Sequence, residues 1–234
     1  MSKLDLGNNE FINYEFHENI GKNTIVFSNS LGSDLSMWDP QVEYFKDNYQ
    51  IICYDKRGHG KSSPIQGPYT FDMLENDVIS IMDEIGIDKV HFVGLSMGGM
   101  TSLGLALKHS NRFDKLVCCA ARADMPPPAI EAWDQRMAVV EDKGTQGVVQ
   151  GSLERWFSDK FRNDVANNHI LEKAEEMIKS TSINGYIGSC NAIKGLDYLR
   201  ELGKIKKDFL YISGENDVGA PALAMDCLLY TSDA

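Results

Sequence analysis

The chain has 234 residues, 43% of them hydrophobic and 24% charged, and its formal net charge is −11. This length and composition are typical of one globular domain, with room for an inserted subdomain, that buries a sizeable core. The negative charge argues against nucleic acid and anionic membranes as partners, because both repel an acidic protein. A small molecule is therefore the partner that we expect.

The N-terminal residues MSKLDLGNNEF lack the apolar segment of a signal peptide, and no apolar run approaches the roughly 20 residues of a membrane span. The five cysteines are odd in number and lack the spacing of metal ligands: Cys53, Cys118, Cys119, Cys190 and Cys227. This pattern favours reduced core thiols. We therefore expect a cytoplasmic protein without a metal site, and the residues do not predict its oligomeric state.

Strand-like and helix-like segments alternate through the first half of the chain. Short apolar runs predict strands at 11–16, 24–28, 49–54, 90–93 and 115–121. Amphipathic or apolar helical spacing predicts helices at 38–46, 69–85 and 99–107. This alternation indicates βαβ units and a mostly parallel sheet with flanking helices on both faces.

The pattern changes after residue 121. Three prolines, Pro126 to Pro128, begin a stretch with no strand signal, in which helices are expected around 130–141, 147–157 and 170–180. Strand character returns at 209–213. We interpret residues 122–188 as a helical cap inserted between two parts of an α/β core, 1–121 and 189–234.

The segment KVHFVGLSMGGMTSLGLAL, residues 89–107, places the sequence G-x-S-x-G between a strand and a helix. This order is typical of a nucleophile elbow, a turn so sharp that Gly94 and Gly98 must lack side chains. The elbow holds Ser96 in a strained conformation with its hydroxyl above the sheet edge. The backbone amide of Met97, at the helix start, then faces a developing oxyanion.

A serine nucleophile needs a base, an acid that orients the base, and oxyanion donors, all on loops at the carboxyl ends of neighbouring strands. The loop after the last strand supplies Asp217, which we choose as the acid, and Asp124 is the alternative. The loop after strand 24–28 supplies the second oxyanion donor, the amide of Leu31, and Gly32 keeps that loop close to the serine.

Four motifs in this order, NSLGSDLSMW, DKRGHGKS, GLSMGG and GENDVGAP, resemble the α/β-hydrolase superfamily. Within this superfamily, three segments resemble the 3-oxoadipate enol-lactonases of the β-ketoadipate route of aromatic breakdown. These segments are SNSLGSDLSMWDPQ, LERWF and GYIGSCNAIKGLD. The resemblance extends to about Met225. It implies an α/β-hydrolase fold and hydrolysis of an enol-lactone to 3-oxoadipate, and it implies no metal or organic cofactor.

In this family the catalytic histidine follows the acid after one more helix and strand. Here all five histidines precede Asp217, and none is a credible base: His17, His59, His91, His109 and His169. Only the cap residue His169 is a remote substitute. We therefore expect a fragment that lacks the last helix, the last strand and the histidine loop and has only low residual turnover. The final residues Cys227–Ala234 match nothing expected there and resemble a translated sequencing adapter.

In the complete parent, Ser96 would attack the lactone carbonyl, and water would then hydrolyse the acyl-enzyme, although direct attack by water stays open. Candidate substrate-binding residues in the cap are Trp133, Arg136, Arg155 and Trp156, and the alternative is that they only pack the cap. Two other functions also stay open. One is a general carboxylesterase of the same fold, and the other is a non-catalytic binding protein that lacks the base.

Overall fold

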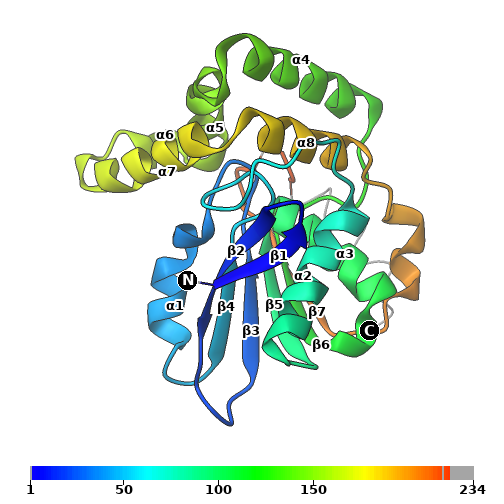
Figure 1. Cartoon of the computed structure of the whole chain (residues 1–234). Helices are drawn as coiled ribbons and strands as arrows, with labels where there is room; N and C mark the ends of the chain where they lie inside the picture. Colours follow the sequence, from blue (N-terminus) through cyan, green and yellow to red (C-terminus); the bar gives the residue numbers. More distant parts are fainter. Residues whose placement is uncertain (1, 218, 222–234) are drawn as a thin grey trace.

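A computed structural model describes residues 2–217 and 219–221 of the chain (Figure 1). Its described residues form a seven-stranded sheet in the order β1-β2-β4-β3-β5-β6-β7. The strands are β1 (Ser2–Gly7), β2 (Glu10–His17), β3 (Thr24–Ser28), β4 (Gln50–Tyr54), β5 (Val90–Leu95), β6 (Phe113–Cys119) and β7 (Phe209–Ile212). Strands β3 to β7 pair in parallel, whereas β1 and β2 form an antiparallel hairpin at one edge.

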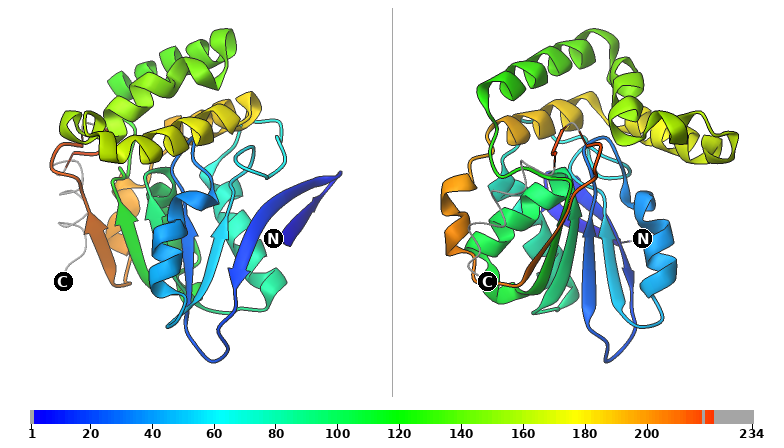
Figure 2. Two further views of the ribbon diagram at one scale, coloured as in Figure 1. Left: turned by 90° about the vertical axis from the view of Figure 1, so that its left-hand side faces the viewer. Right: turned by 180° about the vertical axis from the view of Figure 1, so that it is seen from behind.

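Helices cover both faces of the sheet (Figure 2). One face packs against α1 (Asp39–Phe45) and the preceding 3₁₀ turn η1 (Leu35–Trp38), around the stacked rings of Phe27 and Trp38. The other face packs against α2 (Phe71–Ile85) and α3 (Met97–Lys108). Because both faces are covered, the central strand β3 is buried along its whole length, and its sequence is correspondingly apolar.

The boundaries of α2 follow from its terminal residues. The Thr70 side chain accepts a hydrogen bond from the Met73 amide at 3.3 Å and caps the first turn. At the other end, Gly86 adopts a left-handed conformation with φ of 78°, which ends the helix and turns the chain toward β5.

A helical cap is inserted between β6 and β7 and lies across the carboxyl ends of the strands (Figure 1). Its helices are α4 (Pro127–Lys143), α5 (Val149–Trp156), α6 (Asp159–Arg162), α7 (Asn168–Ser180) and α8 (Ile183–Lys194). Short 3₁₀ turns complete the described elements: η2 (Ser110–Arg112), η3 (Thr145–Val148), η4 (Val165–Asn167) and η5 (Leu199–Lys204). The cap thus covers the sheet edge where the elbow lies.

Helix α8 is attached to the core through facing glycines. A Cβ on Gly58 would lie 2.2 Å from the Gly185 Cα, so both positions require glycine. The Ser182 amide donates to the Gly58 carbonyl at 2.9 Å, and the Tyr69 amide donates to the Gly188 carbonyl at 3.2 Å. These contacts bring the cap backbone directly onto core loops.

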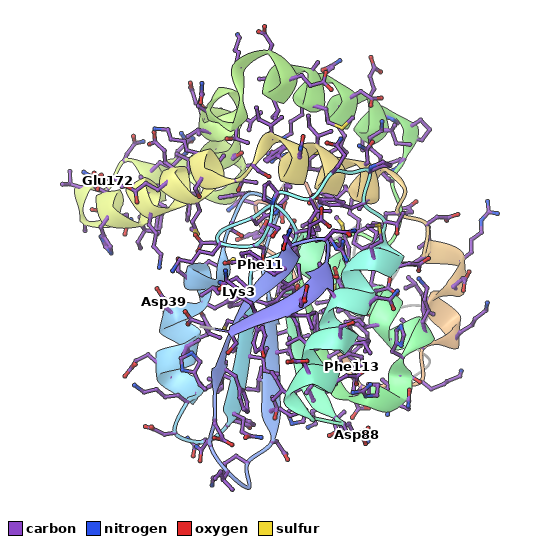
Figure 3. The ribbon with its side chains drawn as sticks, in the orientation of Figure 1. Lys3, Phe11, Asp39, Asp88, Phe113 and Glu172 are labelled. Atoms are coloured by element: carbon purple, nitrogen blue, oxygen red, sulfur yellow. The ribbon has the colours of Figure 1, made fainter. Side chains whose placement is uncertain are left out.

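The structure confirms the predicted α/β-hydrolase fold with a mostly parallel sheet and an inserted cap. Strand β1, which we did not predict, pairs with β2 through a tight turn in which Asn8 and Asn9 have φ of 53° and 62°. Across this hairpin the Lys3 ammonium lies 3.7 Å from the centre of the Phe11 ring (Figure 3). The proposed division at residue 188 stays a prediction, and α8 runs across it.

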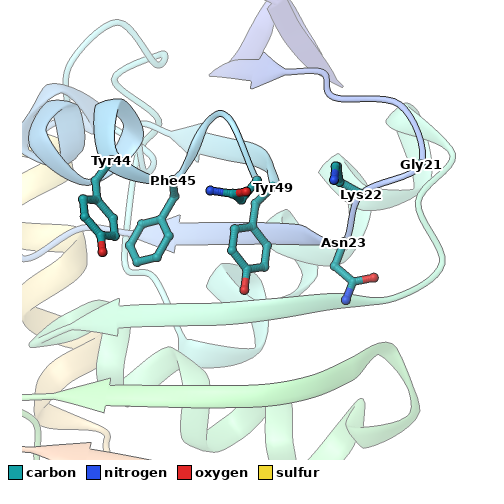
Figure 4. A pocket seen from close by; sticks show the side chains of 7 residues that line it. Gly21, Lys22, Asn23, Tyr44, Phe45 and Tyr49 are labelled. Atoms are coloured by element: carbon teal, nitrogen blue, oxygen red, sulfur yellow. The ribbon is translucent and has the colours of Figure 1, made fainter.

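Two further findings complete the fold. No helix among the described residues combines the length and apolarity that crossing a membrane requires. An open hollow of about 750 Å³ lies beside Tyr44, Phe45 and Tyr49 (Figure 4). Because it adjoins the starts of β3 and β4, it lies at the opposite end of the sheet from the elbow.

Candidate active site

Ser96 occupies the turn between β5 and α3 with φ of 53° and ψ of −112°. A non-glycine residue with positive φ is strained, and such strain persists only where the surrounding structure enforces it. Here the Ser96 amide donates to the Cys119 carbonyl at 2.8 Å, and the Met100 amide donates to the Ser96 carbonyl at 2.9 Å. The elbow backbone is therefore fixed from the neighbouring strand and from the helix.

The glycines beside Ser96 are required by close backbone contacts. A Cβ on Gly94 would lie 2.1 Å from the Gly98 carbonyl oxygen. A Cβ on Gly98 would lie 2.2 Å from the Ser28 carbonyl oxygen, at the end of β3. Both distances are far below van der Waals contact, so the expectation that these positions exclude side chains agrees with the packing.

The loop after β3 passes beside the elbow. The Gly98 amide donates to the Asn29 carbonyl at 3.1 Å, which ties this loop to the first turn of α3. Gly32 has φ of 74°, and the Ser33 hydroxyl donates to the Ser30 carbonyl at 3.0 Å, so the loop turns sharply around Leu31. In the described part of the chain, neither the Leu31 amide nor the Met97 amide donates to a protein acceptor.

Asp217 lies in the loop that follows β7, and its Oδ1 accepts hydrogen bonds from the Gly219 and Ala220 amides at 2.8 and 3.0 Å. The alternative acid, Asp124, follows β6, where its backbone bridges to Asp197 at the exit from the cap. Its carboxylate lies 3.8 Å from Arg122. The structure thus places Asp124 at the base of the cap, and the choice of Asp217 stays a prediction.

None of the five histidines hydrogen-bonds to Ser96 in the described structure. His91 is the second residue of β5, about 16 Å along the chain from Ser96, which follows the other end of that strand. His109 follows the far end of α3, about 18 Å along that helix. His169 lies in the first turn of α7, and the His17 ring lies 3.8 Å from Glu15.

His59 is fully buried in the turn after β4, where its Nδ1 pairs with the Arg57 carbonyl at 2.9 Å. Burial lowers the pKa of His59 to about 4, so the ring is neutral at physiological pH. Its Nε2 has no hydrogen-bond partner among the described residues. These contacts are those of a structural residue in the turn.

The loop after β3 carries the predicted oxyanion donor Leu31 and is called the oxyanion loop below. The cap meets this loop at Gly32. A Cβ placed there would lie 3.5 Å from the Tyr186 ring and the Ile178 side chain, and 3.9 Å from the Trp156 ring. Trp156, which we predicted to wall the site, therefore lies over this loop. Tyr186 was not predicted, because nothing in its local sequence distinguishes it from a core tyrosine.

The cap arginines lie together around two aromatic rings. Arg136 lies 6.0 Å from the Trp133 ring centre, and its Nε donates to the Tyr186 hydroxyl at 2.5 Å. The Arg136 Nη2 also donates to the Ser152 hydroxyl. Arg155 lies 5.8 Å from the same Trp133 ring. The structure thus brings together three of the four predicted cap residues, namely Trp133, Arg136 and Arg155.

Arg155 is an exposed residue next to a like charge. Desolvation by the surrounding protein, and then the nearby Arg136 guanidinium, lower the pKa of Arg155. The charge of Asp217 acts in the opposite direction on this pKa. Within residues 2–217 and 219–221, neither Arg136 nor Arg155 forms an ion pair with a carboxylate.

The described residues contain no group of three or more His, Cys, Asp or Glu side chains arranged to hold a metal ion. The site combines a hydroxyl at a strained turn, backbone amides without protein acceptors beside it, and two cations in the cap. A parallel sheet with such an elbow beneath a helical cap defines a class of hydrolases.

The comparisons agree with this class. The family model for the alpha/beta hydrolase fold matches residues 23–228, and the chain belongs to this family. A similar protein, 3-oxoadipate enol-lactonase 2 of Acinetobacter baylyi, is 36% identical over 206 residues, which are 88% of this chain and 76% of the relative. The chain is accordingly an ester or lactone hydrolase of the α/β-hydrolase family.

Two further relatives show the range of reactions near this chain. The crystal structure of the enol-lactonase from Burkholderia xenovorans LB400 has a TM-score of 0.89 and 34% identity, and covers 96% of this chain and 85% of its own. The putative carbamate hydrolase RutD of Caulobacter sp. strain K31 is 32% identical over 166 residues, which are 70% of this chain and 60% of the relative.

Proposed function

We propose that this protein hydrolyses a carboxylate-bearing lactone, namely 3-oxoadipate enol-lactone, to 3-oxoadipate in the β-ketoadipate route, inside the cytoplasm. Ser96 is the nucleophile, Asp217 the orienting acid, and the amides of Leu31 and Met97 bind the oxyanion. Support comes from the strained elbow and from the names of two similar proteins, which are enol-lactonases.

The observation that carries the substrate class is the pair of cap arginines without acid partners. The chain as a whole has a net charge of −11, yet these two cap cations have no carboxylate partner among the described residues, so a ligand carboxylate can pair with them. A guanidinium binds a carboxylate through charge-assisted hydrogen bonds. Arg155 is the group available to do so, because Arg136 is already held by Tyr186 and Ser152.

The proposed reaction uses these groups in sequence. The Ser96 hydroxyl attacks the lactone carbonyl while a base takes its proton, and the Leu31 and Met97 amides bind the resulting oxyanion. The ring C–O bond then breaks and releases an enolate, which takes up a proton and becomes the 3-oxo group. Water hydrolyses the acyl-serine, and Trp156 and Trp133 confine the acyl chain beneath the cap.

The proposal includes slow turnover by these 234 residues, because no histidine follows Asp217 in the sequence. Oxyanion donors and substrate binding alone leave a residual acceleration of about 10³ to 10⁴ over water when a triad lacks a member. Imidazole added in solution can supply the absent proton acceptor. Hydrolysis should therefore rise with imidazole concentration and be abolished by Ser96→Ala.

The substrate class is tested by comparing 3-oxoadipate enol-lactone with the methyl ester of its carboxylate, in the presence of imidazole. We expect the parental chain to prefer the acid by 10-fold or more in kcat/KM, and Arg155→Ala to lose this preference mainly through KM. Lys160→Ala, a neighbouring exposed cap cation, is the matched control and should retain it.

Three results would contradict this assignment. Equal kcat/KM for the acid and the ester in the parental chain would favour a general carboxylesterase. A carbamate cleaved faster than either would favour the activity named in the RutD relative. Binding of the lactone without any Ser96-dependent hydrolysis at saturating imidazole would favour a binding protein.

A further inference from the structure

Lys56 is a buried lysine that the mechanism above does not use. It follows β4 and is 1% exposed, beneath the loop that carries Leu31. Burying an amine away from water is unfavourable unless it is hydrogen-bonded. In the described structure, the Lys56 Nζ has one hydrogen-bond acceptor, the carbonyl oxygen of Asn29.

The neighbouring acid does not explain this lysine. The Asp55 carboxylate accepts hydrogen bonds from the Leu35 amide at 2.7 Å, the Lys61 amide at 2.9 Å and the Asn13 side chain at 2.8 Å. It is therefore satisfied without Lys56. The lysine instead donates to the Asn29 carbonyl, and its Nζ lies 5.6 Å from the Tyr54 ring centre.

The Asn29 peptide links the two proposed oxyanion donors. Its carbonyl accepts from Lys56 and from the Gly98 amide, which belongs to the same turn as Met97. Its side chain accepts from the Trp38 indole at 3.2 Å, and two residues further along lies Leu31. A rotation of the Asn29 peptide would release Gly98 and redirect the amides that follow it. Lys56 opposes that rotation from the interior.

We propose that Lys56 is a positioning residue that holds the Asn29 carbonyl and thereby keeps the Leu31 amide aligned with the Met97 amide. The inference rests on the proposed oxyanion role of these two amides. Lys56 does not touch the substrate, and its contribution acts through the loop. A donor at the end of a long side chain suits this task, because Lys56 follows the neighbouring strand β4 and reaches across to the Asn29 carbonyl.

Two substitutions test the donor. Lys56→Met keeps the volume and removes the hydrogen bond, whereas Lys56→Gln retains an N–H donor on a shorter chain. The control is Tyr69→Phe, which removes another buried hydrogen bond to a loop carbonyl, from the Tyr69 hydroxyl to Ile65 at 2.5 Å, away from the oxyanion loop. The first readout is the rate at which a fluorophosphonate labels Ser96, and the second is amide deuterium exchange.

Lys56→Met should slow the labelling of Ser96 at least 10-fold. This is smaller than the effect of removing one oxyanion donor outright, because the Leu31 amide is displaced and not lost. The substitution should also accelerate exchange in residues 29–35 alone. Lys56→Gln should recover part of both, and Tyr69→Phe should label within about twofold of the parent. Unchanged labelling and exchange in Lys56→Met, a general rise in exchange, or no recovery in Lys56→Gln would each overturn the proposal. If Ser96 is not labelled even in the parent, the proposed function fails, while exchange in 29–35 still decides the role of Lys56.

Discussion

At the scale of single residues, the site depends on groups held in unfavourable states by their neighbours. Ser96 keeps a positive φ because the Cys119 carbonyl and the first turn of α3 fix its backbone. Lys56 is buried with one acceptor, and burial lowers its pKa to about 7. Both groups reduce stability locally, which is common where function requires a fixed geometry.

The lowered pKa of Lys56 predicts a pH-dependent stability. The folded value of about 7 lies below the ordinary value of 10.5, so between these values the unfolded chain binds one more proton. The free energy of unfolding therefore rises with pH in that window, by up to about 1.4 kcal/mol per pH unit from this group. The Lys56→Met variant lacks this contribution. The other buried titratable groups, namely the cysteines, the tyrosines, Asp55 and His59, are present in both the parent and the variant.

Urea unfolding at pH 7, 8 and 9 measures this effect as a difference between the parent and Lys56→Met. Lys56→Met should be more stable than the parent at pH 7, and this advantage should shrink by about 1 kcal/mol per pH unit. An advantage that does not vary with pH would show that Lys56 keeps an ordinary pKa in the folded chain.

At the scale of elements, the cap is joined to the core by the contact of α8 with the turn at Gly58. A Cβ on Gly185 would lie 2.5 Å from the Gly58 Cα and carbonyl oxygen, so backbone would have to move. In contrast, a Cβ on Gly151 in α5 would meet nothing within 4 Å. A side chain is therefore excluded at Gly185 in α8 but has room at Gly151 in α5.

Gly185→Ala should destabilise the protein by about 3 kcal/mol through overpacking, whereas Gly151→Ala should stabilise it by about 0.5 to 1 kcal/mol through helix propensity. Urea unfolding of both variants beside the parent measures the two effects. If Gly185→Ala were as stable as Gly151→Ala, the close contact between α8 and the core would be refuted.

Much of the sheet was predictable because its strands are continuous apolar runs. Strand β3 matches the predicted range, and β4 and β5 differ from theirs by one or two residues. Strand β1 was missed because its alternating polar residues carry no strong signal until it pairs with β2. Helix α8 was missed because its glycines disfavour helix, and their requirement arises only from packing against Gly58 and Gly67.

The site was predictable only where its residues act through local sequence. The elbow at Ser96 and its glycines follow from a strand, a tight turn and a helix in succession. In contrast, the role of Tyr186 depends on Arg136, which lies 50 residues away in the sequence. The role of Lys56 depends on Asn29, which lies 27 residues away. Such contacts have no sequence signature in a single chain, and the positions of Asp217 and Arg155 relative to Ser96 depend on the same tertiary arrangement.

At the scale of the whole molecule, an acidic protein carries a small cationic region in its cap. The net charge of −11 would slow the approach of an anionic substrate, and the arginines near Trp133 offset this only locally. The cap meets the oxyanion loop at Gly32, where a Cβ would lie within 4 Å of side chains from α5, α7 and α8, and the same loop meets the elbow through the hydrogen bond from Gly98 to Asn29. Binding by the cap and chemistry at the elbow are thus coupled through one loop.

The central claim is that Ser96 is a nucleophile beside a formed oxyanion hole, and labelling by a fluorophosphonate tests it most directly. Intact-mass and peptide mapping of the purified chain should show one adduct, on Ser96, that forms faster with added imidazole and is absent in Ser96→Ala. A folded chain that forms no adduct at saturating imidazole, or one that is modified elsewhere while Ser96 stays free, would contradict the account.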